Sequence, residues 1–167
     1  MIDESAAKTN LTRRYGRGPK TARLDASAPH GHWCTTTMIS SLRSDGSTAC
    51  LTLDGATDTE VFQVYVKAVL CPTLRPGDTV VRDNLRAHKN EQTLALIEQT
   101  GAYGAFLPAY SPDLNPIERM WSQVKARLRT AQARTQESLL EAIGKALAAV
   151  SAQDAQNWFA HCGYTFI

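Results

Sequence analysis

The chain has 167 residues, 43% of them hydrophobic and 20% charged, and its formal net charge is +2. These values are typical of one globular domain that can bury a core without covalent staples. No apolar run approaches the roughly 18 residues of a membrane span, and the N-terminus lacks the pattern of a signal peptide. We therefore expect a soluble, cytoplasmic protein that does not contact a membrane.

The cysteines are scattered, with no C-x-x-C pair among Cys34, Cys50, Cys71 and Cys162. We interpret them as reduced thiols of a cytosolic protein rather than as a disulfide set. The segment His30-x-His32-x-Cys34 has the residue types of a zinc site. It lacks a fourth ligand at a suitable spacing, so zinc is not expected.

The N-terminal part begins with a short apolar start and continues into a basic segment. Met1 and Ile2 precede Asp3, which predicts a first strand cut short and ending at that aspartate. Residues 8–23 contain six bases and no acid: Lys8, Arg13, Arg14, Arg17, Lys20 and Arg23. Such a stretch can be ordinary solvated surface, but the absence of acids favours contact with a polyanion.

The next segments read as a hairpin followed by a helix. Residues 35–43 and 47–55 are rich in Thr and hydrophobic residues, and Ser44-Asp45-Gly46 supplies a turn between them. Asp58 can cap a helix over residues 58–70, which Pro72 ends.

The middle of the chain alternates strands and helices. A strand over 79–83 ends at Asp83, and Arg82 stands where a buried strand prefers an apolar residue. A helix over about 90–100 is ended by Gly101, and a brief strand follows over 105–108.

The segment YSPDLNPIERMW, residues 110–121, opens the longest predicted helix, over 116–129. Asn115 is a candidate N-cap, Pro116 the first helical residue, and Glu118 either reaches back to the cap or is aimed at a site. Trp121 falls on the apolar side and is expected in the core. Further helices are predicted over 136–150 and around Trp158 and Phe159.

This order predicts an α/β fold with a mixed five-stranded sheet flanked by helices. Three early strands joined by loops favour an antiparallel meander, and the two later strands favour parallel additions with helical crossovers. We expect one domain over residues 1–167, with residues 151–167 as a C-terminal tail helix packed on it.

Three acids are candidates for one metal site. Asp3 and Asp83 are both predicted to end strands, and Glu118 enters from the helix after the fifth strand. Two carboxylates about 4 Å apart repel by roughly 4 kcal/mol at an effective dielectric of 20, so their convergence calls for divalent cations such as Mg²⁺ or Mn²⁺. Each acid also has a simpler interpretation. Asp3 can belong to a frayed terminus, Asp83 can be a turn residue, and Glu118 can be a helix cap.

The motifs IDES, RRYGRGPK, TVVRDNLRAHK, LPAYSPDLNPIERMWSQVKARLR and NWFAHCGY resemble the catalytic domain of bacterial insertion-sequence transposases of the mariner-like superfamily. The resemblance runs over nearly the whole chain and is most specific over residues 107–125. It implies a ribonuclease-H-like fold and a DDE triad formed by Asp3, Asp83 and Glu118, with 34 residues between the last two.

The activity implied by this resemblance is cleavage of DNA at transposon ends and joining of the 3′-OH to target DNA. Asp3 and Asp83 would bridge two Mg²⁺ or Mn²⁺ ions and Glu118 would complete one of them, in a two-metal phosphoryl transfer. A homodimer on DNA, in the bacterial cytoplasm at the nucleoid, is expected from the family.

DNA contacts are expected from basic and polar side chains near the triad and in the basic segment. They are Arg13, Arg14, Arg17, Lys20, Asn84, Arg86, His88, Lys89, Lys125 and Arg129. Lys125 and Arg129 lie seven and eleven residues after Glu118, on the same side of a helix. His88 can equally be a surface histidine.

The chain departs from the family that it resembles in two respects. The family's N-terminal helix-turn-helix region is not found in it, and Arg82 stands where a buried strand prefers an apolar residue. Two alternatives therefore stay open. The chain can be a weakly active transposase remnant, or one of two frames whose partner chain supplies the helix-turn-helix. It can also be a nucleic-acid-binding module that uses the basic segment alone.

Overall fold

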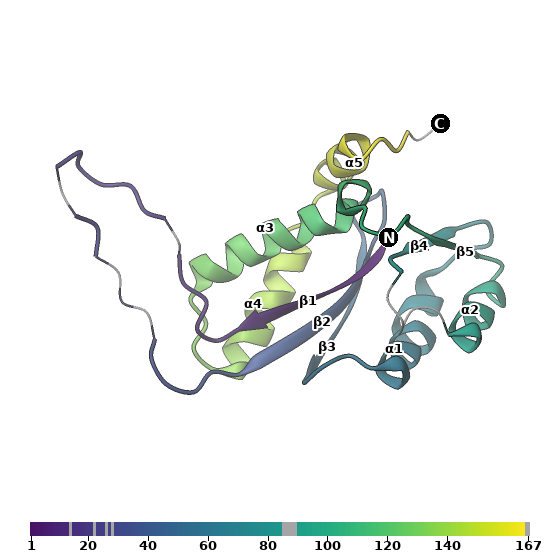
Figure 1. Cartoon of the computed structure of the whole chain (residues 1–167), viewed down its shortest axis with the longest axis horizontal. Coiled ribbons are helices and arrows are strands. Elements are labelled where there is room, and N and C mark those ends of the chain that lie inside the picture. Colours follow the sequence, from purple (N-terminus) through teal and green to yellow (C-terminus); the bar gives the residue numbers. More distant parts are fainter. Residues whose placement is uncertain (14, 22, 26, 28, 85–89, 166–167) are drawn as a thin grey trace.

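The computed structural model describes residues 1–13, 15–21, 23–25, 27, 29–84 and 90–165 (Figure 1). Its elements follow the order expected from the sequence. The strands are β1 Ile2–Lys8, β2 Thr35–Leu42, β3 Thr48–Asp54, β4 Thr79–Arg82 and β5 Tyr103–Phe106. The α-helices are α1 Thr59–Tyr65, α2 Glu91–Glu98, α3 Pro116–Ala131, α4 Gln136–Ala148 and α5 Ala152–His161.

The hairpin of β2 and β3 is confirmed. The two strands pair antiparallel from Thr36 opposite Asp54 to Leu42 opposite Thr48. Gly46 closes the turn at φ +85°, and a Cβ there would lie 2.8 Å from the backbone of Ser151. Glycine is therefore required both by the left-handed backbone and by the close approach of the chain before α5.

The prediction of a shortened first strand was wrong. β1 has seven residues and pairs antiparallel with β2 along its whole length, so Asp3 is its second residue and lies opposite Ser40. Residue propensities do not predict a strand over IDESAAK, because its composition is mixed and only Ile2, Asp3 and Ala7 are buried. The backbone ladder to β2 holds the segment extended.

The five strands are divided between two sheets rather than forming the single expected sheet. Among the described residues, β1, β2 and β3 form one antiparallel sheet, and β4 and β5 form a parallel pair. β4 packs beside β1, which places the two sheets edge to edge. The expected mixture of an antiparallel meander and two parallel strands is thus present, in the expected chain order.

Helices cover both faces of the three-stranded sheet (Figure 1). β2 alternates between the two layers: Met38 and Leu42 pack with Trp121 of α3, whereas Ile39 packs with Phe62 of α1. Trp121 is 2% exposed, so its expected core position is confirmed. No helix in the described ranges is both long and apolar enough to cross a membrane.

The helix predicted over 58–70 changes character along its length. Asp58 caps it, accepting a hydrogen bond from the Val61 N–H at 2.8 Å. The α-helical part ends at Tyr65, and the chain continues as a π turn over Val66–Leu70 and a 3-10 turn over Cys71–Thr73. Pro72 lies in that last turn and stops the helix as predicted.

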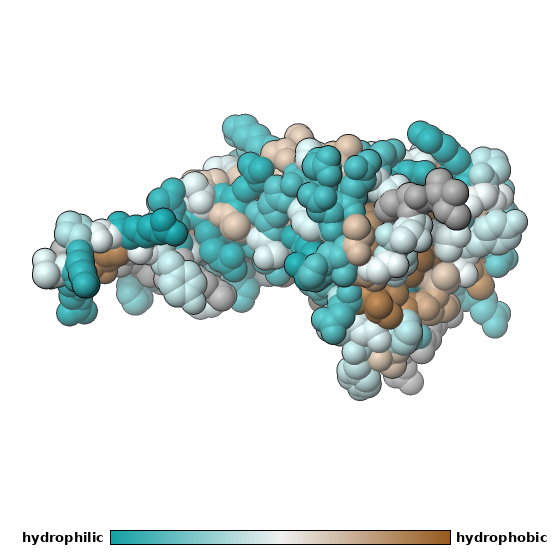
Figure 2. Space-filling view, turned by 90° about the horizontal axis from the view of Figure 1, so that it is seen from above, coloured by the Kyte–Doolittle hydropathy of each residue, from teal (hydrophilic) through white to brown (hydrophobic). Residues whose placement is uncertain are grey.

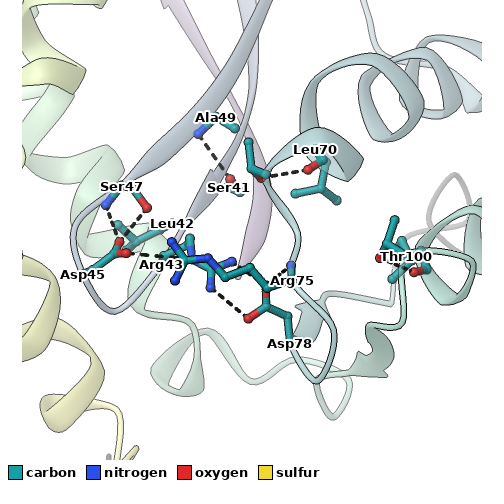
Figure 3. A network of polar contacts seen from close by, with 12 residues as sticks. Ser41, Leu42, Arg43, Asp45, Ser47, Ala49, Leu70, Arg75, Asp78 and Thr100 are labelled. Carbon is teal, nitrogen blue, oxygen red and sulfur yellow. Dashed lines mark hydrogen bonds and ion pairs between the residues drawn. The ribbon is translucent and has the colours of Figure 1, made fainter.

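A polar network joins the β2–β3 turn to the start of β4 (Figure 3). The Arg43 guanidinium forms a two-pronged ion pair with Asp78, with N–O distances of 2.6 and 2.8 Å. Asp78 also accepts from the Arg75 N–H at 2.8 Å, and these hydrogen bonds hold the pKa of its carboxyl below the usual range. The network fixes β4, and therefore the residue that follows it, relative to β1 and β2.

Candidate active site

The three predicted acids line one cleft of about 660 Å³, which we call the acid cleft. Asp3 comes from β1, Asp83 directly follows β4, and Glu118 lies in the first turn of α3. Its remaining lining is formed by Asn84, Asn115 and residues 107–112. The structure therefore brings together side chains that are separated by 79 and 34 residues along the chain.

Asp3 carries the clearest electrostatic signal of the acid cleft. It is 7% exposed, and no hydrogen-bond partner for its Oδ2 atom is found in the part of the chain that is described. Burial, followed by the charges of Glu118 and Asp83, raises the pKa of its carboxyl from 3.8 to about 7. An ionised Asp3 is thus costly here unless a cation shares the cleft.

The arrangement fits hard divalent cations in its donor chemistry. All three acids offer oxygen ligands, and the unpartnered Asp3 oxygen and the mutual repulsion of the acids are both relieved by a cation. Among the described residues, however, no group of three or more acid, histidine or cysteine side chains lies close enough together to hold a metal ion. Cation binding must therefore draw the three carboxylates closer together.

The local geometry at α3 leaves Glu118 exposed on the cleft wall rather than engaged as a cap. Asn115 is the N-cap residue and Pro116 the first helical residue, as predicted, but the Asn115 side chain makes no capping hydrogen bond. Its Oδ1 atom is buried and has no partner in the described structure. The turn is closed by backbone hydrogen bonds, from the Asn115 N–H to Pro112 C=O at 3.0 Å and from the Glu118 N–H to Asn115 C=O at 3.2 Å.

Hydrogen bonds join the chain at the ends of β4 and β5, where it forms part of the cleft wall. The Asn84 amide donates to Leu107 C=O at 2.5 Å, and the Leu107 N–H donates to Arg82 C=O at 2.8 Å. The Asn84 Nδ2 atom therefore holds the wall in place, while its predicted DNA contact stays a prediction. Arg86, His88 and Lys89 lie outside the described residues.

Arg82, which the sequence marked as out of place, is buried next to the site. It is 1% exposed, its guanidinium lies 4.6 Å above the Phe106 ring, and burial lowers its pKa. Gly104 leaves room for it, because a Cβ there would lie 3.2 Å from the Arg82 Nη2 atom. The cation–π contact offsets part of the cost of burying this charge.

The predicted DNA-contacting bases of α3 form a stripe that leads away from the acid cleft. Lys125 and Arg129 are partly exposed on the same side of α3 as Glu118. At 1.5 Å per residue, they lie about 10 and about 16 Å along the helix from Glu118. α3 runs from the acid cleft toward the base of the loop between β1 and β2 (Figure 1).

That loop, residues 9–34, carries Arg13, Arg17 and Lys20, all exposed; Arg14 lies outside the described residues. Figure 2 shows the loop as a mostly hydrophilic arm that extends away from the body of the molecule. The Arg134 Nη1 atom donates to Thr9 C=O at 3.0 Å and to Leu11 C=O at 2.9 Å. Arg134, which follows the end of α3, therefore anchors the base of the arm.

The base of the arm lies away from the acid cleft. It begins beyond Lys8, whereas Asp3 lies near the opposite end of β1, and five residues of strand span about 17 Å. A separate groove of about 830 Å³ lies between α3 and α4, but Glu141 is its sole acid. Among the pockets lined by described residues, the acid cleft is thus the one in which several carboxylates converge.

Comparisons with known proteins agree with this geometry. A family model described as DDE superfamily endonuclease matches residues 1–140. Among curated proteins, none matches the chain.

Solved structures of the Mos1 transposase are similar in fold. A paired-end complex with the left transposon end is 17% identical with a TM-score of 0.68, covering 95% of this chain and 50% of that one. The Mos1 strand transfer complex is 17% identical with a TM-score of 0.63, covering 99% and 55%. A mariner Mos1 paired-end complex with Mg is 16% identical with a TM-score of 0.63, covering 97% and 50%.

These likenesses confirm the expected fold class, a mixed α/β fold like the ribonuclease-H-like catalytic domain of that transposase. The chain spans about half the length of the matched chains. Sequence reasoning found the three acids of the cleft. It assigned Asn115 only as a cap and gave no role to Tyr110, although both line the cleft.

Proposed function

Because this chain belongs to the DDE superfamily endonucleases, we propose that it is a transposase catalytic domain of the mariner-like, bacterial insertion-sequence branch. It cuts DNA strands at transposon ends and transfers the freed 3′ end to target DNA. The observation that carries this proposal is the convergence of Asp3, Asp83 and Glu118 on one cleft.

Divalent cations, Mg²⁺ or Mn²⁺, would be held by these three carboxylates. All three side chains would supply carboxylate oxygens to two such ions. Such ions neutralise the phosphate that is attacked and lower the pKa of the attacking water or hydroxyl. The chain itself contributes positioning: the ladder to β2 holds Asp3, the end of β4 holds Asp83, and the turn at Pro116 directs Glu118.

DNA would leave the acid cleft along α3 and reach the arm. Lys125 and Arg129 follow Glu118 on one helix stripe, and Arg134 fixes the arm at the end of that helix. A continuous basic path of this kind supports binding to the DNA backbone rather than to a single small phosphate. We further propose a homodimer on DNA, with transposon-end recognition supplied by a helix-turn-helix outside this sequence.

A second candidate is a DNA-binding module that does not cut. It is favoured by the absence of a ready-made metal group among the described residues and by the position of the arm far from the acid cleft. The two candidates differ in their dependence on the carboxylates, because binding through the arm does not require them.

Nicking of supercoiled plasmid separates the two candidates. The chain should nick plasmid DNA with Mg²⁺ or Mn²⁺ and should stop doing so as Asp83→Asn, while retaining DNA binding. Asp113→Asn is the matched control, because Asp113 is an exposed acid of the same region that does not line the acid cleft. Equal nicking by the wild type and Asp83→Asn would reject the active-site assignment.

A further inference from the structure

Tyr110 is the most exposed large hydrophobic residue of the described chain and lies on the wall of the acid cleft. Its relative exposure is 102%, so its ring packs against none of the residues that the structure describes. Its backbone is left-handed, with φ +57°. A bulky side chain raises the energy of that conformation, which glycine or asparagine adopts at lower cost.

The segment that carries Tyr110 is fixed on both sides. Before it, the Leu107 N–H and C=O are bonded to Arg82 and Asn84, at 2.8 and 2.5 Å. After it, the Tyr164 hydroxyl donates to Leu114 C=O at 2.9 Å. The backbone between these anchors is therefore placed by the fold, and the outward ring is a consequence of that placement rather than of a frayed end.

Packing does not explain a tyrosine at this position. A ring that is fully exposed contributes no burial, and its backbone conformation costs stability, so the residue gains nothing within the isolated chain. An aromatic ring beside a site is useful when a flat partner can cover it. The three acids of the cleft disfavour an acidic peptide as that partner, and a phosphate must enter the cleft for the proposed chemistry.

We propose that Tyr110 is a stacking platform for a nucleobase adjacent to the phosphate that enters the acid cleft. The inference rests on the proposed function, since it supplies the substrate detail of that same site. Inside a duplex, neighbouring base pairs stack on both faces of each base, so the ring can cover only an unpaired base or the last base of a DNA end. The acid cleft would therefore favour DNA that is frayed or open at the reacting position.

The test compares the binding of two DNAs of equal length in the presence of Ca²⁺. One is a hairpin with one unpaired 2-aminopurine at its end, and the other is fully paired and closed at its end. The wild type should bind the first DNA more tightly and quench its fluorescence. Tyr110→Ala should weaken that binding by roughly 5-fold or more and restore the fluorescence, while Tyr110→Phe keeps both. Binding of the closed DNA should be unchanged.

Two further variants make the outcome specific. Tyr103→Ala removes another exposed tyrosine, 66% exposed on β5 and outside the cleft lining, and should leave binding unchanged. Tyr110→Gly removes the ring and also the backbone strain, so it should fold at least as well as the wild type but bind like Tyr110→Ala.

The stacking proposal is overturned, with the proposed function intact, if Tyr110→Ala binds and quenches like the wild type while plasmid nicking persists. It is equally overturned if Tyr110→Phe loses as much affinity as Tyr110→Ala, since the hydroxyl would then be the contact. A wild type that neither binds these DNAs nor nicks plasmid would reject the proposed function and the stacking platform together.

Discussion

Replacing Asp3 by asparagine should stabilise the metal-free protein at alkaline pH. The Asp3 carboxyl is buried, and burial together with Glu118 and Asp83 raises its pKa from 3.8 to about 7. The folded state therefore keeps a proton that the unfolded state releases, and stability falls as the pH rises from about 4 to about 7. Asparagine keeps the shape of the side chain but has no charge to bury.

The magnitude follows from that shift. One pKa unit corresponds to about 1.36 kcal/mol, so ionising Asp3 in the folded state costs roughly 4 kcal/mol, less what local relaxation and water recover. At about pH 8.5 without metal, Asp3→Asn should be more stable than the wild type by roughly 2–4 kcal/mol. At about pH 4, where the wild-type carboxyl is already protonated when folded, the two should differ by less than about 1 kcal/mol.

Urea denaturation in EDTA at these two pH values measures the difference, with Asp113→Asn as a matched control that should show no such pH dependence. Adding Mn²⁺ at the higher pH should stabilise the wild type more than Asp3→Asn. A difference between wild type and Asp3→Asn that stays constant from acid to alkaline pH would refute the argument, because the burial cost must appear as Asp3 loses its proton.

Three other outcomes are expected. Arg43→Ala should lower the free energy of unfolding by about 1–3 kcal/mol near neutral pH, because it breaks the ion pair with Asp78. The loss should shrink in acid as Asp78, whose pKa is lowered in the folded state, becomes protonated. A loss that does not depend on pH in denaturation curves would exclude the ion pair as its cause. Gln132→Gly should raise stability by about 1 kcal/mol, since Gln132 ends α3 at φ +49°, and a lower melting temperature would contradict this. Exchanging Arg13, Arg17 and Lys20 of the arm for glutamine should reduce the slope of log affinity for DNA against log salt by up to about 3, and an unaltered slope would show that these side chains do not contact DNA.

Local signals predicted the parts of the fold in which neighbouring residues set the structure. Asp58 caps α1 as its residue type and the following apolar spacing indicate, and the Ser44-Asp45-Gly46 turn closes the hairpin. The three acids of the cleft came from their positions after or near strands and from the resemblance, and the structure does bring them into one cleft.

Features that depend on tertiary contacts could not be predicted from the sequence. β1 is extended because β2 pairs with all seven of its residues, although its own composition does not favour a strand. Arg82 is tolerated in the core because Phe106 and Gly104, more than twenty residues away, supply a ring and a gap. The Asn115 side chain is buried against the cleft instead of capping α3, which a cap preference cannot anticipate.

Mn²⁺ soaked into crystals of this chain and located by its anomalous scattering would show whether the three carboxylates hold a metal. An ion should appear in the acid cleft, about 2.0–2.3 Å from carboxylate oxygens of both Asp3 and Asp83, with Glu118 moved toward it. The same soak with Asp83→Asn should lose or weaken that signal. Ordered Mn²⁺ elsewhere on the protein, with the three carboxylates still apart and the acid cleft empty at saturating metal, would contradict the account.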